Sequence, residues 1–272
     1  MSEDEAFAAA VAKGAFAGMN KPAYERKEEL AEGVTLYLGD CRDILPGLGP
    51  VDHIITDPPF SENTHAGHNG ISSRTNRTAL SYGSISDADA EQLAALFATS
   101  SAGWVVWFTD HHLAPSIRAA MKATGRAVFA PLPFIQPGRS VRLSGDGPSS
   151  WTDWMVCART SALKKWGTLP GGYIAGEGWK DKEHMGGKPL KLMLAVVNDY
   201  SRPGDLVCDP CLGGGTTLVA CIRLGRRGVG IERDPATFDK ACRRISAALK
   251  EPDMFIEHYQ PMQLSILDED AA

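Results

Sequence analysis

Residues 51–60 read Val51-Asp52-His53-Ile54-Ile55-Thr56-Asp57-Pro58-Pro59-Phe60. An apolar run that ends in Asp-Pro-Pro predicts a buried strand that stops abruptly, because proline donates no hydrogen bond to a sheet and restricts the residue before it. The strand then ends on the carboxylate of Asp57. Open α/β sheets bind ligands beyond the carboxyl ends of their strands, so we expect a site here. Taken alone, the motif also fits a plain strand followed by a proline turn.

The chemistry of these four residues suits an amino group. The carboxylate of Asp57 and the backbone carbonyl of Pro58 offer two acceptors, and the rings of Pro58 and Pro59 stiffen the loop that holds them. An amino group has two protons to donate to such a pair. Phe60 adds a flat apolar face on which a nucleic-acid base can stack.

A second stretch of the same kind follows a short apolar strand at 206–208 and reads Asp209-Pro210-Cys211-Leu212-Gly213-Gly214-Gly215-Thr216-Thr217. Three glycines between a strand and a helix let the backbone approach a ligand and leave helix N-terminal amides for a negatively charged group. The next strand, 228–231, ends at Glu232, 23 residues after Asp209 and near the spacing of an acid that grips ribose hydroxyls. The stretch lacks both the G-x-G-x-x-G order of a dinucleotide fold and the Gly-Lys-Thr of a P-loop. A nucleoside ligand without a pyrophosphate therefore fits better than NAD or ATP.

Strands and helices alternate along the rest of the chain. The pattern predicts strands at 34–38, 104–109, 127–135 and 153–158, and helices at 42–48, after the cap Ser86, around 113–121, from Lys188 to Tyr200 and at 218–224. Such alternation predicts an α/β fold with a doubly wound, mostly parallel sheet. We expect a helical extension at 1–33, one catalytic domain at 34–250 and an acidic tail at 251–272.

Composition limits the class of protein. The chain has 272 residues, 43% of them hydrophobic, which suffices for a full core, and its net charge is −5. Both tails are acidic, whereas residues 34–250 carry 24 basic against 20 acidic side chains, a balance that permits nucleic-acid binding. Neither a transmembrane run nor the charge order of a signal peptide is present, so a cytoplasmic protein is expected. The six cysteines show no disulfide framework, and the lone Cys208/Cys211 pair lacks a second pair with zinc spacing, so no metal site is predicted.

Three polar loops are candidates for contact with nucleic acid, at 61–86, 136–152 and 161–187. The first is longer than a compact domain needs, which favours a mobile functional loop. The third interleaves lysines with Trp166 and Tyr173, a mixture that suits phosphates and bases, although a plain surface loop explains it equally well. The residues that we expect to make these contacts are His65, Arg74, Arg77, Arg139, Arg142, Lys164 and Lys165.

The two motifs together resemble the S-adenosylmethionine-dependent DNA amino-methyltransferases, which alkylate the exocyclic nitrogen of adenine or cytosine. The resemblance covers roughly residues 34–248 and includes Gly39-Asp40, His184 with Lys188-Pro189, and Glu232 in the expected order. Because the Asp-Pro-Pro-Phe motif precedes the glycine stretch, the order resembles the circularly permuted beta type of that family. The fold implied is the Rossmann-like methyltransferase sheet. Cys211 stands where the family commonly has an aromatic residue, and Gly214 where it often has serine.

The resemblance implies roles for single residues. Asp57, Pro58, Pro59 and Phe60 would hold the target base and form the catalytic motif. Asp209, Gly213, Gly215 and Thr216 would cradle the methionine part of S-adenosyl-L-methionine, Glu232 would bind its ribose, and Asp40 its adenine amino group. The wider cofactor-binding set adds Cys41, Lys188, Pro210, Cys211, Thr217 and Arg233.

Several alternatives stay open at this point. The leading Asp favours adenine N6 over cytosine N4 in the family, where a leading serine is commoner for cytosine. An RNA or protein-glutamine methyltransferase could use a related tetrapeptide, and a DNA-binding protein without activity could retain the fold. The partner expected is DNA, with no membrane, and related enzymes often form homodimers. No separate recognition domain is evident, so we expect a short or relaxed target sequence.

Overall fold

The computed structural model describes residues 23–62, 83–138, 148, 150–163, 166–176 and 187–250. Its strands are β1 (Arg26–Ala31), β2 (Val34–Leu38), β3 (His53–Thr56), β4 (Trp104–Thr109), β5 (Ala127–Val128), β6 (Leu132–Ile135), β7 (Thr152–Arg159), β8 (Tyr173–Ile174), β9 (Leu206–Asp209) and β10 (Arg227–Glu232). Its helices are α2 (Cys41–Leu48), α4 (Asp87–Ser100), α5 (Ala114–Ala123), α6 (Leu190–Tyr200), α7 (Thr216–Arg223) and α8 (Pro235–Ala248). Within the described ranges, none of these helices has the length and apolar character needed to cross a membrane.

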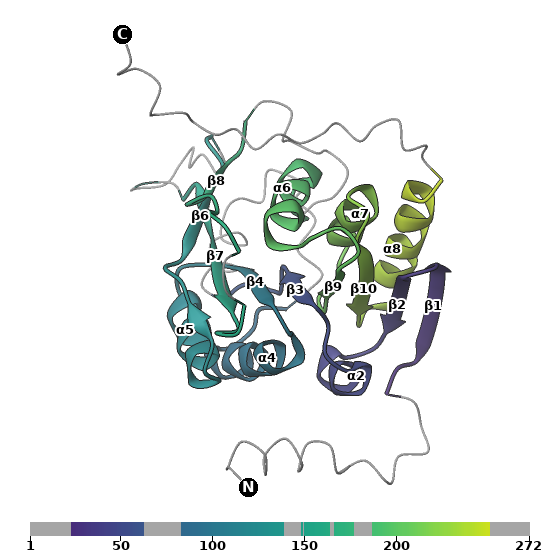
Figure 1. The fold of residues 1–272 in the computed structure, drawn as a ribbon, viewed down its shortest axis with the longest axis horizontal. Helices are drawn as coiled ribbons and strands as arrows, with labels where there is room; N and C mark the ends of the chain where they lie inside the picture. The colour runs from purple at the N-terminus through teal and green to yellow at the C-terminus, as the bar shows by residue number, and fades with distance from the viewer. Residues whose placement is uncertain are drawn as a thin grey trace, which may run out of the picture.

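The strands form one sheet in the order β1-β2-β10-β9-β3-β4-β7-β6-β8, with β5 paired to β7. Strands β2, β10, β9, β3 and β4 are parallel, so their carboxyl ends lie at one edge of the sheet. Strand β7 runs antiparallel to β4, β5 and β6. The parallel centre has helices on both faces: α2, α4 and α5 lie on one side and α6, α7 and α8 on the other (Figure 1). The prediction of a doubly wound, mostly parallel sheet is therefore confirmed.

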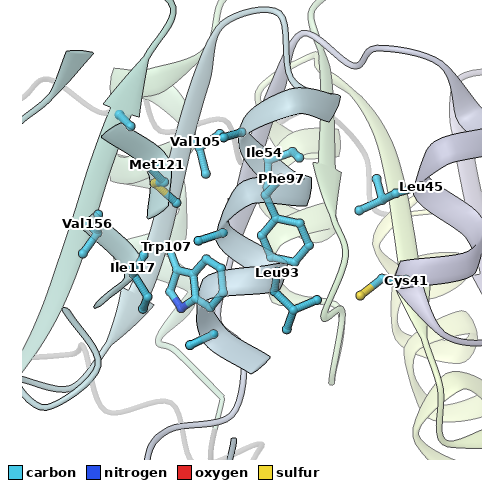
Figure 2. Packing of buried hydrophobic residues seen from close by; sticks show 14 of the residues in the cluster. Cys41, Leu45, Ile54, Leu93, Phe97, Val105, Trp107, Ile117, Met121 and Val156 are labelled. Carbon is cyan, nitrogen blue, oxygen red and sulfur yellow. The ribbon is translucent and has the colours of Figure 1, made fainter. Parts of the chain in front are cut away.

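The strands that carry the two motifs are central and buried. Every residue of β3 and β4 is buried, as expected of strands covered on both faces. On one face of the sheet, side chains of α4 and α5 pack around Trp107, with Phe97 and Ile117 among its neighbours (Figure 2). A second cluster places α6 against the opposite face of β4, where Phe108 and Val106 lie. This packing fixes the carboxyl ends of the strands from both sides.

Two expectations about the elements were wrong. Residues 26–31, assigned to a helical extension, form strand β1, which pairs antiparallel with β2 through the turn at Glu32-Gly33. Gly33 has a φ of +78°, the backbone conformation that such a hairpin turn requires. The single strand expected at 127–135 is two strands, because the pairing with β7 shifts by one residue between Val128, opposite Ala158, and Leu132, opposite Met155.

Candidate active site

The two motifs lie side by side at the carboxyl edge of the sheet. Strand β3 pairs in parallel with β9, with Ile54 opposite Cys208, so that Asp57 and Asp209 leave neighbouring strand ends. The hydroxyl of Thr56 donates to Oδ1 of Asp209 at 2.8 Å. This hydrogen bond places the two motifs, which are distant in the sequence, next to each other.

Asp209 is a buried carboxylate that accepts hydrogen bonds from neighbouring groups of the protein. Besides Thr56, the hydroxyl of Thr217 donates to its Oδ2 at 2.5 Å, and the backbone N–H of Cys211 donates to Oδ1 at 3.1 Å. Burial raises the pKa of Asp209 to about 6, against the opposing effect of these hydrogen bonds. Because Asp209 is only 2% exposed, its carboxylate binds to the surrounding protein and fixes the loop that follows it.

Asp57 is paired with Lys188, which precedes helix α6. The ammonium Nζ of Lys188 donates to Oδ1 of Asp57 at 2.7 Å and lies 3.4 Å from Oδ2 of Asp153 on β7. The side chains of Lys188 and Asp153 are 9% and 8% exposed, and that of Asp57 is 22% exposed. The structure thus places Lys188 on the catalytic motif, although the sequence assigned it to the cofactor. Asp153 was missed, because an acid inside a strand pattern gives no signal of its partner.

Phe60 lies beside the same ammonium. Its ring centroid is 4.8 Å from Nζ of Lys188, and the ring centroid of Phe108 is 5.2 Å from the same atom. The next residue, Ser61, donates to Oδ2 of Asp110 through its backbone N–H at 2.9 Å and through its hydroxyl at 2.5 Å. Asp110 follows β4, so the end of a third parallel strand anchors the chain after the motif.

The described ends of the 61–86 loop meet next to the motif. Ser61 forms a parallel bridge with Ile85, whose N–H donates to the carbonyl of Phe60 at 3.2 Å. Ser86 then caps α4 by accepting from the N–H of Asp89 at 3.1 Å, as the sequence predicted. The loop therefore starts and returns beside the predicted base-binding residues.

The glycine stretch is tied to Glu232 at the end of β10. The backbone N–H of Gly213 donates to Oε2 of Glu232 at 2.9 Å, and that of Asp234 donates to Oε1 at 2.8 Å. Gly215 has a φ of +79°, and a Cβ there would lie 2.9 Å from Cδ1 of Ile245. The positive φ favours glycine at this position, and a Cβ would also require the side chain of Ile245 on α8 to shift. The hydroxyl of Thr216 accepts a hydrogen bond from Arg244 at 2.8 Å.

Asp40 stands at the next strand end, beside Glu232. Strands β2 and β10 pair with Leu38 opposite Glu232, and the N–H of Gly39 donates to the carbonyl of Glu232 at 2.9 Å. Asp40 caps α2 by accepting from the N–H of Arg42 at 2.9 Å and also accepts from its Nε at 3.1 Å. Burial acts to raise the pKa of Asp40, but the hydrogen bonds and charge of Arg42, with the charge of Arg233, outweigh it and lower that pKa. Asp40 is therefore an ionised acceptor beside Glu232.

Three other predicted cofactor residues lie around this loop. Cys41 is buried in the first turn of α2, and Cys211 packs against the same core cluster. A side-chain hydrogen bond with Cys41, together with burial, raises the pKa of Cys211 well above its usual value, so Cys211 is a protonated thiol at neutral pH. Pro210 is buried between Asp209 and Cys211.

The residues predicted to touch DNA lie outside the described part of the chain. They are His65, Arg74, Arg77, Arg139, Arg142, Lys164 and Lys165. For two aromatic residues of the 161–187 loop the base-stacking interpretation was wrong. The indole of Trp166 donates to the carbonyl of Asp199 at 2.8 Å and packs on His53 and Trp104 at the amino ends of the strands. The hydroxyl of Tyr173 donates to Oδ2 of Asp199 at 2.7 Å and the residue is buried. Both side chains therefore pack against the protein itself, because Asp199 near the end of α6 supplies a hydrogen-bond acceptor for each.

Comparison with known families agrees with this geometry. Residues 151–243 match the family model described as DNA methylase, of the N6/N4 methyltransferase type. Over these residues the chain is similar to the DNA methylase family. The match contains Lys188, Asp209, the glycine stretch and Glu232, and it confirms the resemblance that the motifs suggested.

Two curated relatives align with this chain over short segments. The type II methyltransferase M.HinfI of Haemophilus influenzae is 38% identical over 72 residues, which are 26% of this chain and 20% of the relative. The type II methyltransferase M.MthZI of Methanothermobacter thermautotrophicus is 42% identical over 62 residues, 23% of this chain and 18% of the relative. The aligned segments thus span about a fifth of each relative.

Solved structures share the fold over most of the chain. The M1.HpyAVI–SAM complex has a TM-score of 0.57 at 22% identity and covers 77% of this chain and 98% of its own. PvuII DNA methyltransferase, described as cytosine-N4-specific, has a TM-score of 0.57 at 14% identity and covers 86% of this chain and 90% of its own. At these identities the likeness establishes the methyltransferase fold and nothing finer.

Proposed function

We propose that this protein transfers a methyl group from S-adenosyl-L-methionine to the exocyclic amino group of a base in DNA, with adenine N6 as the favoured target. The observation that carries the proposal is the bond between Thr56 and Asp209, which joins the amine-binding motif to the glycine stretch at one edge of the sheet. Neither motif could perform the reaction alone. The family match over residues 151–243 and the type II methyltransferases among the relatives support the same chemistry.

The residues around the glycine stretch fit the cofactor. Glu232 is held by two backbone amides, and a carboxylate accepts about four hydrogen bonds, so it retains capacity for ribose hydroxyls. Asp40 stands at the adjacent strand end as an acceptor for the adenine amino group. Gly213 and Gly215, at φ of +51° and +79°, keep the loop free of side chains where the methionine part would approach. Asp209, Thr217 and Cys211 would fix that loop from beneath.

The catalytic motif would activate the amine by hydrogen bonding. A base amino group is a poor nucleophile because its lone pair is delocalised into the ring. Donation of its two protons to Asp57 and to the carbonyl of Pro58 would favour tetrahedral nitrogen and stabilise the positive charge that develops there. When bound, the cofactor supplies a methyl group already activated by a sulfonium. The N–C bond forms as the S–C bond breaks, and the nitrogen then releases one proton.

Base access and positioning complete the mechanism. In duplex DNA the base must leave the stack to reach Asp57, and Phe60 would then offer it a stacking surface. Because no covalent enzyme intermediate is needed, positioning of the amine against the methyl group provides much of the rate. The described ends of the 61–86 loop meet beside Phe60, and the basic residues predicted in this loop remain candidates for contacts with DNA phosphates.

The first experiment incubates the protein with methyl-labelled cofactor and DNA, RNA or a glutamine peptide, and then digests the labelled DNA to nucleosides. We expect label in DNA, as N6-methyladenine. N4-methylcytosine would establish the alternative base, and label confined to RNA or peptide would overturn the proposal. Single-molecule sequencing of DNA from expressing cells tests the expected short or relaxed target. One strict site of five or more base pairs would contradict that expectation.

A further inference from the structure

Two carboxylates share one buried ammonium in this protein. Lys188 Nζ lies 2.7 Å from Oδ1 of Asp57 and 3.4 Å from Oδ2 of Asp153. Asp57 belongs to the catalytic motif, whereas Asp153 lies on β7, which reaches the site only by pairing with β4. Nothing in the proposed chemistry uses Asp153, yet its side chain is 8% exposed and faces this ion.

Burial of these three charged groups together has a large cost in desolvation free energy. Removing an ammonium and two carboxylates from water carries a large desolvation penalty, which is offset only by close pairing. Among the charged side chains that the structure describes here, the ammonium of Lys188 contacts both carboxylates, that of Asp57 and that of Asp153. The rings of Phe60 and Phe108, at 4.8 and 5.2 Å from Nζ, confine the ammonium further. Lys188 is thus held in place from the interior by Asp153, while Asp57 is the most exposed of the three.

We propose that Asp153 is a positioning residue for methyl transfer, which acts through Lys188 to fix the orientation and basicity of the Asp57 carboxylate. This inference rests on the proposed function. Lys188 holds Oδ1 of Asp57, and a carboxylate has further lone pairs with which to accept the amine. Asp153 competes for the same ammonium and so prevents Lys188 from neutralising Asp57 completely. Asp57 then stays a strong acceptor in one fixed geometry, which is what a developing positive charge on nitrogen requires.

The sign of each change follows from the charges. Among the described residues, the charged groups that the structure places around Asp57 are Lys188, Asp153 and Asp209. Loss of the negative charge at Asp153 lets Lys188 act on Asp57 alone, which lowers the pKa of Asp57 and weakens it as an acceptor. Loss of the positive charge at Lys188 raises that pKa. The acid limb of the pH profile of kcat should therefore move to lower pH when the charge at Asp153 is lost. It should move to higher pH when the charge at Lys188 is lost.

The test compares Asp153→Asn, Lys188→Met and Lys188→Arg in the full-length protein with DNA and labelled cofactor. Asp153→Asn should lower kcat roughly 10- to 100-fold, the scale of a misplaced catalytic group, with the cofactor KM within about twofold of wild type. Its acid limb should shift to lower pH. Lys188→Met should shift the limb to higher pH, and Lys188→Arg, which retains the charge, should restore it toward the wild-type position.

A matched control is Asp205→Asn. Asp205 is also a partly buried carboxylate with a basic partner, since it is hydrogen-bonded to Nε2 of His53 at 3.0 Å, but it lies before β9 at the opposite edge of the sheet. We expect this variant to lose stability without a shift of the acid limb. A kcat for Asp153→Asn within twofold of wild type, with an unmoved limb, would overturn the inference. If Asp153→Asn does not fold, identical profiles for Lys188→Met and Lys188→Arg would overturn it equally.

The inference and the proposed function can fail separately. Label incorporation by the wild-type protein decides the function before any variant is made. If the wild type methylates no DNA, the carboxyl ¹³C titration of Asp57 still tests the coupling, because it needs no turnover. An Asp57 titration that is the same in wild type, Asp153→Asn and Lys188→Met would reject the coupling whatever the reaction is.

Discussion

The hydroxyl of Thr56 donates to Oδ1 of Asp209 at 2.8 Å across 153 positions of the sequence. Thr56 is the last residue of β3 and Asp209 the last of β9, so the bond joins the ends of two parallel neighbours. It links the residue before Asp57 to the residue that opens the glycine stretch. The proposed amine and cofactor sites therefore share one rigid support.

Asp57→Ala should abolish methyl transfer while cofactor binding is kept. The variant removes the acceptor for the base amine, and loss of one such group typically costs 10²–10³-fold or more in rate. Label transfer to DNA measures the rate, and calorimetric titration measures cofactor affinity. Glu91→Ala, an exposed change on α4, is the control and should behave as wild type. Turnover retained by Asp57→Ala would contradict the role given to this carboxylate.

Thr56→Val should destabilise the fold by about 1–3 kcal/mol, because it keeps the shape of the side chain but leaves a buried carboxylate without one of its donors. Urea unfolding at neutral pH measures the loss. Thr99→Val is the matched control, since that hydroxyl is exposed on α4 and donates to carbonyls of its own helix. Its effect should stay within about 0.5 kcal/mol. Equal losses in the two variants would mean that the bond between Thr56 and Asp209 adds no stability.

Titration of Asp209 should lower the free energy of unfolding as the pH rises from about 4 to 6. Burial raises the pKa of this carboxyl from 3.8 to about 6 in the folded protein, so the folded state binds more protons than the unfolded state within this window. The linked contribution is present below pH 4 and is lost above pH 6, with a size of about 3 kcal/mol. Asp209→Asn does not titrate.

The measurement is the difference in unfolding free energy between wild type and Asp209→Asn, taken at pH 4 and at pH 7. Other carboxylates titrate in both proteins and cancel in the difference. The wild type should lose stability relative to the variant as the pH rises. A difference that does not change with pH would show that Asp209 titrates normally in the folded protein.

Gly215→Ala should weaken cofactor binding about tenfold or more, which corresponds to 1.4 kcal/mol. The φ of +79° strains any side chain, and the new Cβ would press on Ile245 at 2.9 Å and displace the loop. Gly225→Ala is the control, because its φ is +69° but no atom lies within 4 Å of its Cβ. This variant should lose some stability through strain and keep cofactor affinity. Equal cofactor affinities in the two variants would contradict the tight fit at Gly215.

Local sequence signals determined the elements of this site. The prolines after Asp57 and the glycines before Thr216 mark strand ends because their effects on φ and on hydrogen bonding act within a few residues. The capping of α4 by Ser86 is also a local interaction, because the hydroxyl of Ser86 accepts from the N–H of Asp89, three residues later. Alternation of apolar strands and amphipathic helices sufficed to predict a doubly wound sheet, and the two motifs sufficed to suggest the family.

The tertiary structure decided which of these residues meet. The bond from Lys188 to Asp57 spans 131 positions, and the contact of Lys188 with Asp153 depends on the antiparallel pairing of β7 with β4. Strand β1 forms because β2 offers it an edge, and Trp166 turns inward because α6 ends in a carbonyl that its indole reaches. Pairing partners and buried charge contacts depend on long-range packing, whose free energy is shared among many residues, so no local pattern in the sequence specifies them.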